Sequence, residues 1–242
     1  MKEEVLIRVE DLTIAYHDKP VLWDTDVNIV KNSITAVIGP NGAGKSTLIK
    51  GILGLQSRLS GEIRIMGEPF KRVQKKINYI PQASAVNWDF PTTVLDVVLM
   101  GRYVHLGWIK RPGKKDVEIA KAAIDRIGLS ALWDRQISRL SGGQRQRVFI
   151  ARAIAQDAEI YFMDEPLAGV DKVTERVIAD FFRAEQKRGR TFVVVHHDLN
   201  TIKEYFDHLV ILNRRVIAEG RVADVFTGEN LERARMTGGR YA

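Results

Sequence analysis

The sequence predicts an α/β fold built on a mainly parallel sheet, and three observations lead to this prediction. Short runs of apolar and β-branched residues recur along the chain, as expected for strands that are buried on both faces. Segments of helical character lie between most of these runs, an order that is typical of a parallel sheet covered by helices. The middle third lacks strand-like runs. We therefore expect an α/β core that carries a helical insertion.

The expected elements follow one another in a regular order. Alternating, turn-punctuated segments in the first sixty-odd residues predict a small antiparallel sheet. From about residue 83 to residue 156 helix-like segments dominate, interrupted by WDFP at 88–91 and RPGKK at 111–115, and we interpret this stretch as the inserted helical subdomain. The expected strands cover residues 5–9, 34–38, 77–80, 159–163, 191–195 and 209–212, and the helices cover residues 45–55, 117–127, 142–156, 173–187 and 199–206.

Composition excludes several classes of function. The 242 residues are 45% hydrophobic and 28% charged, which suits a soluble globular chain with a sizeable core. No stretch approaches the roughly 20 apolar residues that span a bilayer, and the amino-terminal segment lacks the pattern of a secretory signal. The chain has no cysteine, which rules out disulfides, thiolate metal sites and a cysteine nucleophile. We expect a cytoplasmic protein.

The net charge of +7 suits a partner that carries phosphates. Nucleotides, nucleic acids and anionic lipid headgroups all meet this description, and a solvated surface with a modest basic excess would give the same value. The basic residues are scattered along the chain, with no run of like charges that marks a tail. Charge alone therefore does not choose a partner.

A glycine-rich segment follows the strand expected at residues 34–38. It reads GPNGAGKST, and its Gly-x4-Gly-Lys-Ser spacing between a strand and a helix is that of a phosphate-binding loop. The glycines allow several backbone N–H groups to face the phosphates, aided by the positive end of the helix. We expect Lys45 to contact the β- and γ-phosphates and Ser46 to bind Mg2+. The candidate nucleotide-binding residues are Gly39, Pro40, Asn41, Gly42, Ala43, Gly44, Lys45, Ser46 and Thr47.

Two acidic residues end the apolar run EIYFMDEP. Asp164 and Glu165 would lie at the carboxyl end of a buried parallel strand, where ligands bind in such sheets. We expect Asp164 to hold Mg2+ and Glu165 to orient and polarise the water that attacks the γ-phosphate. Two solvated acids at a strand end would show the same pattern, but the phosphate-binding loop makes that reading the weaker one.

A third motif, LSGGQRQRVFIARAI, begins at Leu140. Ser141, Gly142 and Gly143 stand where a helix would start, so that a hydroxyl, backbone N–H groups and a helix dipole converge on one anion site. The motif resembles the signature sequence of ATP-binding cassette (ABC) ATPases, and the resemblance extends over the whole chain. It implies one ABC ATPase domain over 1–242, with an amino-terminal β subdomain and phosphate-loop core (1–82), a helical signature subdomain (83–156) and the remainder of the core with a carboxyl-terminal tail (157–242).

The resemblance assigns roles to further residues. Tyr16 matches the aromatic residue that stacks on adenine, Gln82 the glutamine that senses the metal and the attacking water, and Asp171 the aspartate of a loop that crosses the dimer interface. His197, directly before Asp-Leu, matches the switch histidine that contacts the γ-phosphate, whereas His196 would point the other way and be structural. The resemblance thus implies catalytic roles for Glu165, His197 and Gln82, Mg2+ ligands at Ser46, Gln82 and Asp164, and nucleotide contacts, in addition to the loop, at Tyr16, Ser141, Gly142, Gly143, Gln144 and Asp171.

Partners also follow from the resemblance. In ABC ATPases the signature of one subunit covers the ATP held by the phosphate loop of another, so a second copy of the chain is expected. In the transporter branch a polytopic permease places a short helix in a groove of the ATPase. We expect that groove near Gln82, Trp88 and Phe90, with Trp108 adding to the aromatic content and the valines at 94, 97 and 98 forming the subdomain core. The protein would then lie peripherally on the cytoplasmic face of the membrane.

The substrate class is the last expectation. The segment after Gln82 and the LAGVD form of the aspartate loop look most like ATPase subunits of bacterial importers for manganese, zinc or ferrous iron. An extracytoplasmic metal-binding protein would be an indirect partner, no nucleic acid would bind, and ATP and Mg2+ would be the cofactors. An importer of chelated iron or cobalamin, or a soluble ABC ATPase of iron–sulfur assembly, remains an alternative that shares the same catalytic motifs.

Overall fold

The computed structural model describes residues 3–17, 19–82, 88, 90–107 and 110–236, and the chain divides into two compact units. The first unit comprises residues 1–74 and 186–242, and the second comprises residues 75–185. Trp108 and residues 83–87, which belong to the segment expected to meet a permease, lie outside the described residues. Each unit has its own strands and helices.

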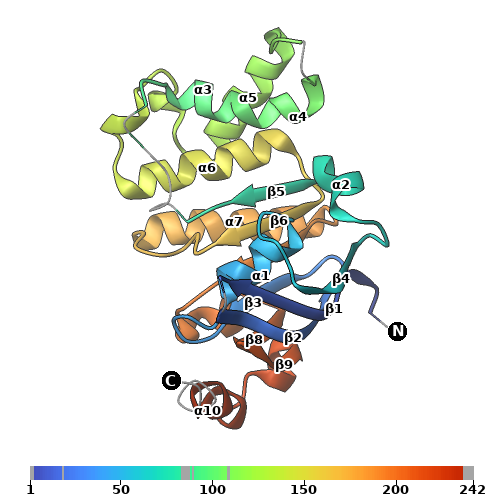
Figure 1. The fold of residues 1–242 in the computed structure, drawn as a ribbon. Coiled ribbons are helices and arrows are strands. Elements are labelled where there is room, and N and C mark those ends of the chain that lie inside the picture. Colours follow the sequence, from blue (N-terminus) through green and yellow to red (C-terminus); the bar gives the residue numbers. More distant parts are fainter. Residues whose placement is uncertain (1–2, 18, 83–87, 89, 108–109, 237–242) are drawn as a thin grey trace. The chain divides into compact units, whose positions relative to one another are not determined.

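The first unit contains the expected antiparallel sheet. Its strands β1 (Val5–Tyr16), β2 (Lys19–Val30) and β4 (Ser60–Ile65) lie side by side in the order β2-β1-β4 (Figure 1). Buried and exposed residues alternate along much of β1, as in a sheet with one face on a core. Strand β1 is longer than the predicted 5–9, because its second half contains the less apolar segment that leads to Tyr16.

The same unit contains a parallel core. Strand β3 (Ile34–Ile38) pairs in parallel with β7 (Thr191–Val195) and β8 (His208–Asn213), and β9 (Arg215–Arg221) pairs antiparallel with β8. Every residue of β3 and β7 is buried, which explains why both read as unbroken apolar runs. The helices of this unit are α1 (Lys45–Ile52), α2 (Phe70–Val73), α8 (Ile202–Tyr205), α9 (Val222–Val225) and α10 (Gly228–Met236).

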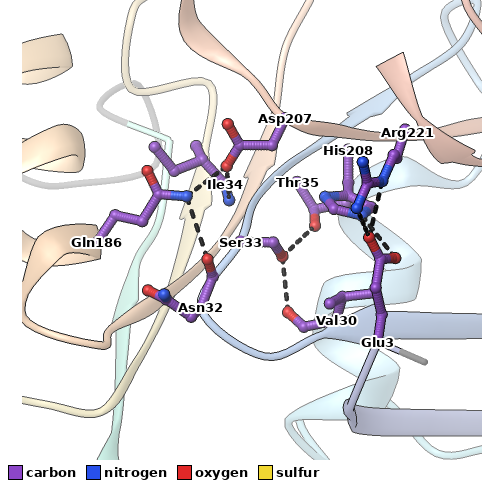
Figure 2. A network of polar contacts seen from close by, with 10 residues as sticks. All are labelled: Glu3, Val30, Asn32, Ser33, Ile34, Thr35, Gln186, Asp207, His208 and Arg221. Atoms are coloured by element: carbon purple, nitrogen blue, oxygen red, sulfur yellow. Dashed lines mark hydrogen bonds and ion pairs between the residues drawn. The ribbon is translucent and has the colours of Figure 1, made fainter. Parts of the chain in front are cut away.

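A polar network fixes the starts of β3 and β8 (Figure 2). The Asp207 carboxylate accepts a hydrogen bond from the backbone N–H of Ile34 at 3.0 Å, and the Gln186 amide donates both to Asp207 and to the Asn32 carbonyl, the latter at 3.1 Å. The Ser33 hydroxyl donates to the Val30 carbonyl at 2.7 Å. These contacts satisfy polar groups at the strand entry and so hold the register with which β3 leads into the glycine-rich loop.

The second unit combines two strands with the helical segments. Strand β5 (Ile77–Ile80) pairs in parallel with β6 (Ile160–Asp164). Its helices are α3 (Val94–Leu99), α4 (Tyr103–Leu106), α5 (Lys114–Arg126), α6 (Gly142–Gln156) and most of α7 (Lys172–Lys187). Between β5 and β6 the described residues form helices and turns, in line with the predicted insertion, and Val94, Val97 and Val98 are buried as expected. The subdomain limits 1–82, 83–156 and 157–242 stay predictions.

Several boundaries differ from the sequence prediction. Helix α5 begins at Lys114, inside the RPGKK segment taken as an interruption, because the Asp116 carboxylate accepts from the Gly113 N–H at 3.0 Å and caps the helix. The predicted helix at 199–206 is a 3-10 turn at 199–201 followed by the single turn α8, and the helix predicted at 45–55 ends at Ile52. In the part of the chain that the structure describes, no helix has the length and apolarity required to cross a membrane.

The buried pair formed by Arg102 and Asp116 generates a prediction about pH. The guanidinium lies 3.0 Å from the carboxylate, and the side chains are only 14% and 12% exposed. The Gly113 N–H, and after it the Arg102 guanidinium, hold the pKa of Asp116 below its usual range. A carboxyl with a lowered pKa in the folded state contributes stability above its unfolded pKa, and this contribution is lost as pH falls through the folded pKa.

We therefore expect Asp116→Asn to lower the free energy of unfolding at pH 7 and to flatten its decline between about pH 5 and pH 2. Urea unfolding of the wild type and the variant at a series of pH values measures both effects. Asp134→Asn, at an exposed position, serves as the control for removing one carboxylate. Parallel pH profiles for the wild type and Asp116→Asn would contradict the assignment.

Candidate functional site

The glycine-rich loop connects the end of β3 to the start of α1. A Cβ atom added to Gly39 would lie 1.9 Å from the Leu212 carbonyl oxygen at the end of β8, so no side chain fits at this position. Gly39 has a φ of 156°, at the edge of the range of positive φ that residues with a side chain rarely adopt. The loop backbone is therefore pressed directly against the end of a neighbouring core strand.

Lys45 turns back over this loop. Its ammonium group donates to the Gly39 carbonyl at 2.8 Å and to the Pro40 carbonyl at 3.0 Å, and the residue is only 7% exposed. A third contact ties the loop together, because the Ala43 N–H donates to the Pro40 carbonyl at 3.1 Å. The arrangement holds a positive charge at the loop beside the first turn of α1, where Ser46 and Thr47 lie, and this is the chemistry that a phosphate group requires.

The other predicted residues of the first unit are placed as follows. His196 is buried, contacts the Thr201 hydroxyl through Nε2 at 2.7 Å and packs against Phe206, in agreement with a structural role. His197 is exposed and lines a cavity of about 170 Å³ together with Gly39 and Pro40. Tyr16 ends β1 and is 40% exposed, so one part of its ring is accessible. Its stacking on adenine stays a prediction.

In the second unit the structure brings Gln82 and Glu165 together. The Gln82 amide donates to the Glu165 carboxylate at 2.8 Å, although 83 positions separate the two residues. Glu165 has a φ of 55°, a left-handed conformation that L-residues other than Asn and Asp rarely adopt. Such a conformation persists only where the surroundings impose it, and it is frequent at functional sites. Two of the three predicted catalytic residues thus form one hydrogen-bonded pair.

Asp164 ends β6 and is 5% exposed. A buried carboxylate is costly unless it is paired or binds a cation. Burial, and then the negative charge of Asp164, raise the pKa of Tyr79 to about 12. A carboxylate oxygen is a ligand that Mg2+ prefers, so the residue type at 164 fits this ion.

The signature residues begin α6. The Ser141 hydroxyl accepts from the Gln144 N–H at 3.3 Å, and the Gln144 side chain accepts from the Ser141 N–H at 3.0 Å. This capping box satisfies two backbone donors and stabilises the helix by about 1 kcal/mol. It also commits the Gln144 side-chain carbonyl to the helix cap, whereas Ser141 and Gly142 remain exposed at the positive end of a 15-residue helix.

Asp171 lies against this same helix start. Its carboxylate accepts from the Thr174 N–H at 2.8 Å and from the Thr174 hydroxyl at 3.1 Å, and these bonds lower the pKa of Asp171. A Cβ added to Gly143 would lie 3.0 Å from the Asp171 carboxylate and 3.1 Å from the Thr174 hydroxyl. The structure therefore brings the signature segment and the aspartate loop of one chain into close contact.

Sequence reasoning missed two contributors to these sites. Thr174 follows Asp171 at the spacing of a helix-capping pair, which is a readable local signal. Arg214 supports the glycine-rich loop through its backbone, since its N–H donates to the Ala43 carbonyl at 2.9 Å. The sequence gives no signal for the contact between Arg214 and Ala43, because it joins two backbones that only the fold brings together.

The aromatic residues after Gln82 differ in exposure. The Trp88 ring packs against Phe149, with the ring centroids 5.0 Å apart, and the Arg145 guanidinium lies 5.2 Å from the Trp88 ring. Phe90 is 64% exposed. Trp88 thus packs against α6, whereas the apolar Phe90 ring is largely exposed.

Comparisons with known proteins agree with this geometry. The ABC transporter family model matches residues 22–168. The zinc transport system ATP-binding protein TroB of Treponema pallidum is 58% identical over 98% of this chain and 88% of its own length. The manganese transport system ATP-binding protein MntB of Bacillus subtilis is 53% identical over 94% of this chain and 91% of its own length. Among solved structures, the ADP conformation of MJ1267, an ATP-binding cassette of an ABC transporter, is 27% identical with a TM-score of 0.81, covering 96% of this chain and 99% of that chain.

The two glycines of the signature provide a test of the contact with Asp171. A side chain at Gly142 would meet nothing within 4 Å, whereas one at Gly143 would force the Asp171 carboxylate away from Thr174. Both substitutions gain the helix propensity of alanine, but only Gly143→Ala should lose the cap, so we expect its free energy of unfolding to be about 1 kcal/mol lower than that of Gly142→Ala. Thermal unfolding of both variants makes the comparison, and equal melting temperatures would disprove the contact.

Proposed function

The chain belongs to the ABC transporter family, whose model matches more than half of its length, and on this premise we propose that it is the ATP-hydrolysing subunit of a bacterial importer for a transition metal such as manganese, zinc or iron. One observation carries the choice of substrate class. Relatives that match over almost the whole chain, at 58% and 53% identity, are named as zinc and manganese transport ATP-binding proteins. The metal ion is the cargo of the assembled transporter.

The phosphate-binding step rests on the loop and on Lys45. A buried ammonium group held at the loop supplies charge to the β- and γ-phosphates, and the N–H groups at the start of α1 add their dipoles. Ser46 and Asp164 would hold Mg2+, which when bound neutralises phosphate charge and so stabilises the transferring group. Tyr16 would stack on adenine with its exposed ring face.

The hydrolytic step rests on the pair of Gln82 and Glu165. A carboxylate has about four lone-pair sites, and the Gln82 amide uses one of those of Glu165. Glu165 would therefore take the proton of the attacking water, with Gln82 fixing the direction of the carboxylate and sensing the Mg2+ site. His197 would stabilise charge on the γ-phosphate from the side of Gly39 and Pro40.

A second copy of the chain would complete each site. Ser141 and Gly142 are exposed at the positive end of α6, where they could bind an anion held by another molecule. The nucleotide held by one chain would be covered by the signature of the other, with Asp171 at the interface. Two ATP molecules would then join the two copies, and hydrolysis would release them.

The permease would dock on the segment that follows Gln82. The exposed Phe90 ring, two residues after the Trp88 that packs against α6, would provide an apolar contact for a short helix of a membrane protein. The ATPase would then lie on the cytoplasmic face of the membrane, and an extracytoplasmic metal-binding protein would deliver the ion to the permease. An importer of a metal chelate is the alternative, favoured by the likeness to an inward-facing ABC transporter of a proposed metal-chelate type, at 29% identity and a TM-score of 0.84.

Purification from native membranes tests the transport function. A tagged chain extracted in mild detergent should bring a polytopic membrane protein with it, and the ATPase rate of the complex should rise with a metal-loaded binding protein. Stimulation by a metal chelate in place of the free ion would favour the alternative. A chain that emerges without any membrane protein would overturn the transport function and leave the ATPase chemistry intact.

Glu165→Gln tests the hydrolytic role. The amide keeps the shape of the side chain and can still accept a hydrogen bond from Gln82, but it cannot take a proton. We expect phosphate release to slow by at least about 100-fold, the usual contribution of a general base, while ATP still binds and stabilises a dimer. Glu159→Gln, which makes the same change at an exposed ion pair with Lys76, should keep the wild-type rate. Unchanged turnover in Glu165→Gln would remove that residue from the mechanism.

Phe90→Ala tests the docking surface. Because the ring is largely exposed, its removal should leave the melting temperature and the basal ATPase rate of the isolated chain unchanged, yet reduce the amount of permease that co-purifies. Trp133→Ala is the matched control, since this ring is also exposed but is covered by Lys121 at 4.3 Å. Equal recovery of the permease with both variants would place the docking surface elsewhere.

A further inference from the structure

The turn after β8 forms the base of the phosphate-binding loop. The Leu212 carbonyl lies directly beneath Gly39, and the Arg214 N–H donates to the Ala43 carbonyl at 2.9 Å. On the other side, the Arg214 carbonyl accepts from the Trp23 N–H at 2.8 Å. Gly39 and Ala43 of the loop therefore both contact the backbone of residues 212–214.

This turn is in a conformation that its residues do not favour. Arg214 has a φ of 60°, in the left-handed region that a residue with a side chain adopts at a cost. Such a conformation lasts only while neighbouring groups hold it in place. The backbone hydrogen bonds to Trp23 and Ala43 help to keep Arg214 in this conformation, and the side chain of the neighbouring residue also contributes.

That side chain is Asn213. The residue is 6% exposed, and its amide donates a hydrogen bond to the Ala234 carbonyl in α10. Ala234 is itself 4% exposed, so the bond lies in a dry environment where an unmade bond is costly. Helix α10 is a nine-residue element that begins at Gly228. The preceding residue, Thr227, caps it, because its carbonyl accepts from the Leu231 N–H and its hydroxyl from the Asn230 N–H. Asn213 thus ties α10 to the base of the loop.

Helix α10 also borders the space beside the loop. The cavity lined by Gly39, Pro40 and His197 is also lined by Leu231, Ala234 and Arg235 of this helix. The loop, the predicted switch histidine and the helix therefore share one small cavity. A shift of α10 changes both the support of the turn and the wall of that cavity.

We propose that Asn213 is a positioning residue that couples the docking of α10 to the geometry of the phosphate-binding loop. When α10 is docked, Asn213 holds the turn and Arg214 holds Ala43 in the phosphate-binding form. Because coupling between two binding events is reciprocal, ATP in the loop in turn favours the docked helix. Docking of α10 then raises the affinity of the loop for nucleotide. This inference rests on the proposed binding of ATP by the loop.

The first test compares two asparagines that make the same type of bond. Asn213→Ala removes the bond to α10, and Asn230→Ala removes an amide bond to the Val225 carbonyl, 3.0 Å long, within the same carboxyl-terminal segment but away from the loop. We expect Asn213→Ala to weaken ATP and ADP binding by about fivefold, the effect of one lost buried hydrogen bond, and Asn230→Ala to bind both nucleotides like the wild type. Equilibrium titration with a fluorescent ATP analogue gives the dissociation constants, and melting temperatures record any general loss of stability.

Unchanged affinity in Asn213→Ala would overturn the proposal, and so would an equal loss of affinity in both variants, because that loss would belong to the stability of the segment. Lys45→Ala separates this outcome from failure of the proposed function. If the wild type and Lys45→Ala bind ATP equally, the loop is not the ATP site and the proposed function itself is wrong.

Hydrogen exchange on the wild-type chain provides a second test that does not depend on a variant that folds. We expect the backbone amides of α10 to exchange several-fold more slowly when ATP is present than in its absence, since ATP favours the docked helix. The β4 amides, in the antiparallel sheet, serve as the internal reference. Equal exchange of α10 with and without ATP would overturn the coupling.

Discussion

The close approach of Gly39 to the Leu212 carbonyl is the constraint on which the nucleotide-binding half of the molecule depends. It is a contact between two backbones, so it tolerates no side chain at residue 39. It also requires β3 and β8 to end at the same level. Their parallel register, which pairs Thr35 with His208 and Ile38 with Ile211, meets this requirement, and the bond from Ile34 to Asp207 fixes it at the other end of the strands. A slip of one residue would move the Leu212 carbonyl away from Gly39 and break the bond between Ile34 and Asp207, so the register of β3 and β8 maintains the geometry of the loop.

In the second unit, hydrogen bonds at the starts of two helices fix the geometry of the signature segment and the aspartate loop. Ser141 and Gln144 cap α6 mutually, and Asp171 accepts from Thr174 in the first turn of α7. The two caps meet at Gly143, where there is room for a hydrogen atom and little more. Each cap satisfies its own backbone donors, so neither depends on a ligand to keep its shape. If an anion binds at the start of α6, as proposed, it would meet a segment that is already ordered, and binding would not carry the entropic cost of ordering the chain.

Local features of the sequence predicted much of this structure. Strands β3 and β7 and helix α6 have the predicted bounds, because a fully buried strand or a capped helix is recognisable from its own residues. The phosphate-binding loop and the candidate carboxylates were recognisable for the same reason. Strand β9 and the contact of α10 with Asn213 were not predicted, because only the fold brings residues such as Asn213 and Ala234 together. The start of α5 was misjudged because a glycine and a proline obscured the cap that Asp116 makes.

The hydrogen bond between Gln82 and Glu165 could be predicted only in part: the residues are recognisable from the sequence, but their contact is not. Strand β5 pairs with β6 so that Ile80 is opposite Met163. Gln82 is two residues beyond Ile80, and Glu165 is two residues beyond Met163, so equal extension past paired strand ends brings the two side chains side by side. The sequence contains both residues but not the register that joins them. The parallel register of β5 and β6 brings the two segments to the same edge of the sheet, and the left-handed conformation of Glu165 then sets the direction of its side chain toward Gln82. The predicted catalytic pair therefore depends on the pairing of β5 with β6.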